Sequence, residues 1–211
     1  MIAPPERSPE RDAALAALLP LVPTRGWTFA ALRRALADTG ADPRDAELLF
    51  PGGAVDMVEA FLDRADRMLE EAAGDFAALR TGPRVRALIA RRLANARPDK
   101  DAVRRAFAVL AQPRNLPVAA RCTARTVDTI WYLAGDKAAD FSWYTKRATV
   151  AGIYSATLLY WLRDASDDDA PTLAFLDRRL AERARVAKLI ERVEGAFDRL
   201  GSCRGAARAG A

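Results

Sequence analysis

Apolar residues recur with the period of an α-helix along the whole chain, and this spacing constrains the fold more than any other feature. No stretch alternates apolar and polar residues as a half-buried β-strand does, and the prolines and glycines stand between the periodic segments. Of the 211 residues, 51% are apolar, which is enough for one domain with a real core. The sequence therefore predicts an all-α protein.

Local signals mark several helix ends. Ser8 followed by Pro9 predicts the N-cap and the first residue of one helix. Thr28 predicts the N-cap of another helix, and Gly40 predicts its end. Pro171 follows an acidic turn and predicts the start of the last helix, because carboxylates favour a helix N-terminus.

Two short helices, expected over 29–40 and 43–50, precede a longer one over 54–74 and suggest a helix-turn-helix. The longer helix has an apolar stripe, made of Val55, Val58, Leu62 and Leu69. The segment from Asp42 to Phe50 would read DNA, yet it carries three acidic residues and one arginine, which phosphates would repel. We weigh a plain helical hairpin above a DNA-binding motif and expect no nucleic acid partner.

The residue types present exclude several kinds of chemistry. The chain has no histidine, which excludes a histidine-based triad, a histidine-ligated zinc and a histidine general base. Cys122 lies beside Arg121 and Arg125, which would lower a thiol pKa, but no base accompanies it, so we expect a buried structural cysteine. No carboxylate spacing matches a metal site. We predict no catalytic residue, no metal and no enzymatic activity.

Charge and cysteine usage indicate the surroundings of the protein. The net charge is +5, but arginine and alanine are abundant throughout, so the charge is weak evidence for nucleic acid. Cys122 and Cys203 form no CxxC pair, and a reducing cytoplasm fits. Residues 1–12 lack the apolar segment of a signal peptide, and the uncharged run over 148–162 is shorter than the roughly 20 residues that span a bilayer. We expect a cytoplasmic protein whose contact with the inner membrane is peripheral.

The segment 140–164 is polar and aromatic at its start and uncharged from Ala148 to Leu162. A helix that is apolar all round is buried on every side, which suits a core helix, a subunit interface or the wall of an apolar cavity. At its start, Trp143 and Tyr144 lie about 100° apart on a helix. At least one of them is therefore expected to reach solvent, as in a protein-binding hot spot, with aromatic capping of the helix as the alternative.

Several segments carry a family resemblance. They are "GWTFAAL" over 26–32, "LFPGGAVDMVEAF" over 49–61, "LAQPRNLPVA" over 110–119, "VDTIWYLAGDKAADFSWYTKR" over 127–147, "IYSATLLYWLRD" over 153–164 and "FLDRRL" over 175–180. Together they resemble the lipid-binding accessory proteins of ubiquinone biosynthesis, the Coq-nine family. The resemblance covers about residues 26–194, and its longest segment is specific.

The resemblance implies a fold and a function. The fold is all-helical and similar to that of TetR-type regulators, with a degenerate helix-turn-helix over 26–60. Members of the family hold a phospholipid or an isoprenoid quinone intermediate in an apolar interior. They form homodimers through their last helices and present the lipid to the di-iron hydroxylase that acts late in ubiquinone synthesis. They perform no chemistry themselves, so we expect no cofactor beyond a bound lipid.

The resemblance also implies site residues. A partner-binding surface for the hydroxylase falls on Asp140, Trp143, Tyr144, Lys146 and Arg147. Lipid-binding positions fall on Trp131, Val150, Tyr154, Leu158 and Trp161.

Three segments are expected along the chain. Residues 1–25 form an N-terminal segment and first helix, residues 26–194 form a single lipid-binding domain, and residues 195–211 form a flexible tail. Mitochondrial members carry a targeting sequence, whose Arg- and Ser-rich pattern is not visible here, and a terminal amphipathic helix that inserts into membrane. Phe197, Leu200 and nearby arginines offer only a shallow contact with anionic lipid.

A transcription regulator with a hydrophobic effector pocket is the alternative function. It would share the helical fold and the apolar interior, and it differs in needing a surface that binds DNA. The acidic segment from Asp42 to Phe50 is the sequence feature that separates the two functions.

Overall fold

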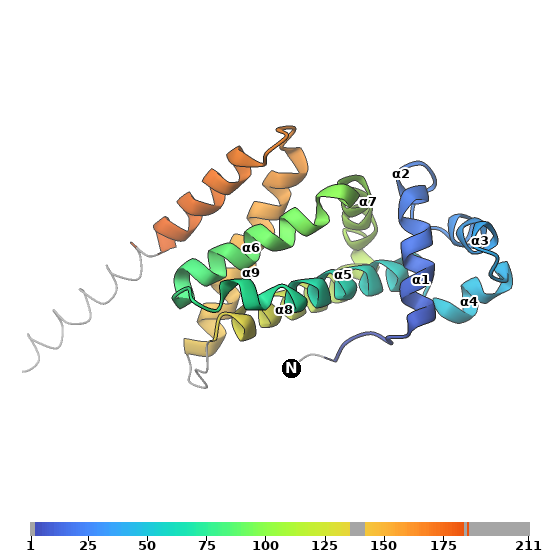
Figure 1. The fold of residues 1–211 in the computed structure, drawn as a ribbon, viewed down its shortest axis with the longest axis horizontal. Coiled ribbons are helices and arrows are strands. Elements are labelled where there is room, and N and C mark those ends of the chain that lie inside the picture. The colour runs from blue at the N-terminus through green and yellow to red at the C-terminus, as the bar shows by residue number, and fades with distance from the viewer. Residues whose placement is uncertain (1–2, 136–141, 184, 186–211) are drawn as a thin grey trace, which may run out of the picture. The chain divides into compact units, whose positions relative to one another are not determined.

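The computed structural model describes residues 3–135, 142–183 and 185 of the chain. It divides the chain into two compact units, Met1–Asp164 and Ala165–Ala211. Every regular element in the described residues is a helix, which confirms the all-α prediction (Figure 1).

The first helices begin where the capping residues predict. The elements are α1 (Pro9–Leu18), η1 (Leu19–Leu21), α2 (Val22–Arg25) and α3 (Phe29–Asp38). Ser8 Oγ accepts a hydrogen bond from the Arg11 backbone N–H at 3.1 Å, and Thr28 Oγ1 accepts one from Ala31 at 3.1 Å. Gly40 has φ +80°, a left-handed conformation that suits glycine and ends α3. Helix α1 packs against α3.

The second short helix is broken into two pieces. A 3₁₀ turn, η2 (Pro43–Asp45), leads into the four-residue helix α4 (Ala46–Leu49). Asp42 Oδ1 accepts a hydrogen bond from the Arg44 backbone N–H at 2.9 Å and so fixes the start. Pro51 disfavours helical geometry at the residue before it, which has φ −135° and ψ 68°. The prediction of one continuous helix over 43–50 was therefore wrong in detail.

The buried face of α5 (Ala54–Glu71) matches the predicted stripe in part, because Val58 and Leu69 are buried as predicted. Its buried apolar residues are Met57, Val58, Ala60, Phe61, Ala65 and Leu69. Val55 and Leu62 are only half-buried. The same helix buries Asp63 and Asp66, which the apolar spacing did not predict.

The rest of the first unit consists of helices that pack around α5. They are η3 (Ala73–Phe76), α6 (Thr81–Ala96), η4 (Arg97–Asp99), α7 (Lys100–Leu110), η5 (Pro113–Asn115), α8 (Leu116–Leu133) and α9 (Ser142–Arg163). Helix α5 contacts α6 and α8, and α9 contacts both α8 and α6. These four helices therefore enclose a common core, next to which α1, α3 and α4 gather near the start of α5 (Figure 1).

The second unit contains one helix within the described residues. Residues 170–183 are helical, which confirms a helix start near Pro171. Asp168 Oδ1 accepts a hydrogen bond from the Ala170 backbone N–H at 3.0 Å. The predicted tail over 195–211 lies outside the described residues.

Candidate functional site

The five predicted lipid-binding residues lie on two neighbouring helices. Trp131 belongs to α8, and the other four belong to α9 at a spacing that places them on one face. All five are buried, and Trp161 is completely buried at 0% exposure. Their contact with a ligand stays a prediction.

A buried polar cluster joins the helices of this core. Arg92 Nε, on α6, donates to Asp66 Oδ1, on α5, at 2.9 Å. Thr126 Oγ1, on α8, donates to the same carboxylate, 2.9 Å from Oδ2 and 3.0 Å from Oδ1. Arg92 Nη2 also donates to the Leu62 carbonyl at 3.4 Å. Tyr154, on α9, lies close enough for the charges of Arg92 and Asp66 to act on its hydroxyl.

Burial governs the ionisation of this cluster. It raises the pKa of the Asp66 carboxyl group, and the facing guanidinium of Arg92 opposes that rise. It also raises the pKa of the Tyr154 hydroxyl, which therefore stays protonated and able to donate a hydrogen bond at neutral pH. The cluster thus places polar donors beside predicted lipid-binding residues.

A row of acidic residues on α5 meets arginines from other segments. Asp56, Glu59, Asp63 and Asp66 recur at steps of three and four, so they share one side of the helix. We call this row, with its arginine partners, the α5 charged seam.

Each acid of the α5 charged seam has an arginine partner. The pairs are Asp56 with Arg11 at 2.6 Å, Glu59 with Arg121 at 2.9 Å and Arg125 at 2.8 Å, Asp63 with Arg7 at 2.7 Å, and Asp66 with Arg92 at 2.9 Å. Sequence reasoning missed this seam. The helical spacing of the four acids was the available signal.

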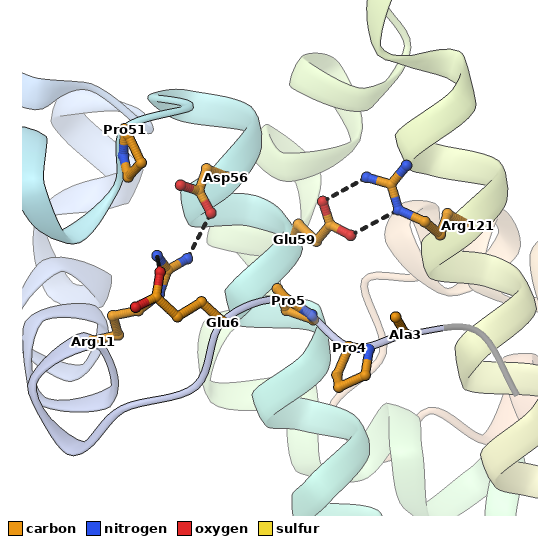
Figure 2. A pocket seen from close by; sticks show the side chains of 9 residues that line it. All are labelled: Ala3, Pro4, Pro5, Glu6, Arg11, Pro51, Asp56, Glu59 and Arg121. Atoms are coloured by element: carbon orange, nitrogen blue, oxygen red, sulfur yellow. Dashed lines mark hydrogen bonds and ion pairs between the residues drawn. The ribbon is translucent and has the colours of Figure 1, made fainter.

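The N-terminal residues cross α5 and α8 and form a pocket with them (Figure 2). The Ala3 carbonyl accepts a hydrogen bond from Arg125 Nη1 at 3.1 Å. The pocket has a volume of about 390 Å³. Its lining includes Pro4, Pro5, Pro51, Glu6, Arg11 and Arg121. Carboxylates and guanidinium groups line it together, so it differs from the apolar cavity expected beside α9.

The structure describes only some of the predicted partner-binding residues. Asp140 lies outside the described residues, as do the side chains of Trp143 and Tyr144, whose backbone forms the first turn of α9. Lys146 and Arg147 are half-buried, and Arg147 Nε donates to Asp128 Oδ1 on α8 at 2.7 Å. That contact fixes the start of α9 against α8. The partner-binding role itself stays a prediction.

The uncharged part of α9 is not buried on every side, which corrects one expectation. Leu159 is 51% exposed and Tyr160 is 37% exposed, and Gly152 is exposed as well. A helix can lack charge all round and still present one open face when a neighbour covers only part of it. Of the three predicted roles, a subunit interface is the one that uses such a face.

Cys122 is buried, as predicted, and its environment makes it unreactive. Burial raises the pKa of its thiol to about 11, although Arg125 Nη2 lies 3.5 Å from Sγ. The neighbouring arginine therefore does not activate it.

The segment that would read DNA is short and acidic. Arg33, on α3, forms a salt bridge with Glu47, on α4, so the charge of one of the few cations near this segment is neutralised within the protein. Leu48 is 79% exposed. None of the described helices is both long and apolar enough to cross a membrane.

These helices together define an all-helical protein with a TetR-like fold. The crystal structure of the TetR transcriptional regulator from Nitrosomonas europaea ATCC 19718 matches with a TM-score of 0.69, covering 84% of this chain and 99% of that chain. At 23% identity, this likeness shows the fold alone. Residues 116–187 match the family model described as COQ9. This match and the named relatives below confirm the resemblance to the COQ9 family found in the sequence.

Several named relatives match most of this chain. The chain is 30% identical over 195 residues to "Ubiquinone biosynthesis protein COQ9, mitochondrial" of Bos taurus and 31% identical over 191 residues to the protein of that name from Drosophila melanogaster. Each match covers 88% of this chain. The chain spans 61% of the length of the first relative and 58% of the second.

Proposed function

We propose that this protein is a non-catalytic, lipid-binding accessory protein of ubiquinone biosynthesis. It binds an isoprenoid quinone intermediate or a phospholipid and presents substrate to the di-iron demethoxyubiquinone hydroxylase. The observation that carries this proposal is the match, over 88% of the chain, to relatives named as ubiquinone biosynthesis proteins.

The apolar face of α9 supports the lipid-binding part of the proposal. Val150, Leu158 and Trp161 are buried on one side of α9, and Trp131 is buried on α8, which packs against α9. An isoprenoid tail has no polar groups to satisfy, and each CH₂ removed from water gains about 0.8 kcal/mol. Apolar side chains on the inner face of α9 provide such an environment.

The position of the predicted partner-binding residues supports substrate presentation. Residues 142–147 of the segment 140–147 form the start of α9, the same helix that carries four of the lipid-binding positions. A hydroxylase that docks on this segment therefore lies at one end of the lipid-binding helix. Transfer over such a short path spares the lipid from crossing water, which is costly for a long apolar tail.

The open face of α9 supports a homodimer through the last two helices. Leu159 and Tyr160 expose apolar surface on α9, and Gly152 is an exposed small residue on the same helix. A second copy that packs there buries this surface. Sedimentation equilibrium of the wild type is expected to show a dimer, and Leu159→Glu is expected to shift it to the monomer.

Two experiments test the proposed function. Native mass spectrometry and lipid extraction of the purified protein are expected to find a bound isoprenoid or phospholipid. A pull-down with the hydroxylase is expected to fail for Trp143→Lys and to succeed for Tyr132→Lys, a control that changes an aromatic residue 73% exposed on α8. A protein that carries no lipid, or a Trp143→Lys variant that binds the hydroxylase normally, contradicts the proposal.

A TetR-like regulator with a hydrophobic effector is the second candidate, because the fold is shared with a transcriptional regulator. Its DNA-reading segment would be η2 and α4, where acids outnumber bases. We therefore expect no salt-dependent shift of duplex DNA at nanomolar protein. Such a shift would favour the regulator.

A further inference from the structure

The segment before α1 crosses α5 and α8 and is held to them at two points. The Ala3 carbonyl accepts a hydrogen bond from Arg125 Nη1, on α8, at 3.1 Å. Four residues further on, Arg7 donates to both carboxylate oxygens of Asp63, on α5, from Nε at 2.8 Å and from Nη2 at 2.7 Å. We call residues 3–7 the N-terminal strap. Figure 2 shows how its first residues run across the two helices.

The N-terminal strap itself is poorly buried. Every residue of it except Pro5 is exposed. The side chain of Arg7 is 45% exposed, whereas that of Asp63 beneath it is 4% exposed. A segment with few buried apolar contacts opens at a low cost in free energy. The two contact points, rather than packing, therefore hold the strap in place.

The core residues at these two points have ionic partners apart from the strap. Asp63 also accepts a hydrogen bond from Arg67 Nε, on its own helix, at 3.3 Å. Arg125 Nη1 also donates to Glu59 Oε1 at 2.8 Å. Breaking a buried ion pair is costly mainly because it leaves one charge without a partner. Release of the strap leaves neither core residue in that state, so the helices stay folded without it.

The sequence of the strap indicates what kind of chain this surface accepts. Pro4 and Pro5 lack backbone N–H groups and hold φ at about −65°, so the chain between the two contacts is extended and needs no partner strand. The surface supplies a donor for a carbonyl, at Arg125, and a carboxylate, at Asp63, whose two oxygens match the forked geometry of a guanidinium group.

The strap also closes one side of the pocket of about 390 Å³. Ala3, Pro4, Pro5 and Glu6 belong to its lining, together with residues from α1, α5 and α8 (Figure 2). Release of the strap therefore opens this pocket and uncovers the α5 charged seam at Asp63. A chain that replaces the strap meets the same carboxylate and guanidinium groups.

We infer that this face of α5 and α8 is a docking site for an extended segment of a partner protein, one that presents a backbone carbonyl and, four residues further on, an arginine. The N-terminal strap fills the site in the free protein and competes with the partner segment. Because the strap belongs to the same chain, its effective concentration at the site is in about the millimolar range. Binding of the partner therefore depends on how firmly Arg7 holds the strap.

A peptide that carries the sequence of the strap tests this competition. The probe is an acetylated, fluorescein-labelled peptide of residues 3–8, and fluorescence anisotropy measures its binding to the full-length protein. Arg7→Ala in the protein weakens the strap and leaves the site intact. Arg34→Ala is the matched control, because it removes an exposed arginine of α3 that pairs with Asp38. A second peptide carries the Arg7→Ala change itself.

The Arg7→Ala protein is expected to bind the peptide roughly 10-fold more tightly than the wild type, because the competing strap has lost a bidentate, charge-assisted contact. The control protein is expected to bind as the wild type does. The peptide without arginine is expected to bind the Arg7→Ala protein roughly 10-fold more weakly than the unchanged peptide. A gain of affinity on loss of an arginine is a result that a purely structural role of Arg7 does not produce.

Three results would overturn the inference. No binding of the peptide to either folded protein, as judged by circular dichroism, would show that the face is not a docking site. Equal affinity for the wild type and the Arg7→Ala protein would show that the strap does not compete. Equal binding of the two peptides would show that the guanidinium is not recognised. Arg7→Lys keeps the charge and loses the forked geometry, and its expected smaller gain in affinity provides the same comparison without removing the side chain.

Discussion

Arg92 Nε donates to Asp66 Oδ1 across 2.9 Å, and this bond joins α6 to α5 where both side chains are almost fully buried. Water cannot replace either partner at such a depth, so each ion depends on the other. Removing one side chain of the pair alone should therefore lower the stability of the fold strongly.

Asp66→Ala is expected to destabilise the fold by about 3–5 kcal/mol, because it leaves the Arg92 charge buried without a partner. Urea denaturation followed by circular dichroism measures the change. The double variant Asp66→Ala/Arg92→Met should lose less than the sum of the two single variants. Additive losses would show that the two side chains do not act as a pair.

The ion pair between Asp12 on α1 and Arg67 on α5 predicts a dependence of stability on pH. A hydrogen bond from Arg67 lowers the pKa of the Asp12 carboxyl group. The contribution of this ion pair to stability is therefore complete above about pH 4, the ordinary pKa of aspartate. It is lost as the pH falls through the lower pKa that Asp12 has in the folded protein. Asp12→Asn should be less stable than the wild type at pH 7, and the difference should shrink towards pH 2. A constant difference would exclude this linkage.

Thr28→Ala is expected to destabilise the protein by about 1 kcal/mol, because Thr28 Oγ1 accepts the hydrogen bond from the Ala31 N–H at the start of α3. Thr24→Ala is the control, since the Thr24 hydroxyl is exposed and bonds only to a nearby carbonyl. Thermal unfolding compares the two. Equal effects would mean that the cap of α3 contributes nothing specific.

Cys122 should react slowly with iodoacetamide in the native protein. With a thiol pKa of about 11, roughly a thousandth of the side chain is thiolate at pH 8, and the sulfur is also buried. The measurement uses a Cys203→Ser background, so that one thiol is counted by mass spectrometry. Denaturation in urea should restore rapid labelling. Rapid labelling without denaturant would refute the buried environment.

Local features of the fold were predictable from the sequence. The caps at Ser8 and Thr28 depend on residues three positions away, so a short segment contains all the information they need. The family signature over 127–147 likewise marked the approach to α9 as a place of interest before any geometry was known.

Long-range pairings were not predictable in the same way. Arg7 and Asp63 are 56 residues apart, and Arg92 and Asp66 are 26 apart, so their meeting depends on how whole helices pack. The open side of α9 has the same origin, because composition gives the polarity of Leu159 but not the position of a neighbouring helix. A sequence pattern assigns residues to a face, and packing decides what that face meets.

Arginine supplies all the cations of the α5 charged seam, and this limits how pH can change the ion pairs that hold other segments to α5. Guanidinium groups keep their protons in alkali, whereas lysine ammonium groups begin to lose theirs near pH 10. The connection between the N-terminal helices and the core should therefore survive basic conditions. These ion pairs therefore hold the N-terminal helices in place constantly and do not switch with a rise in pH.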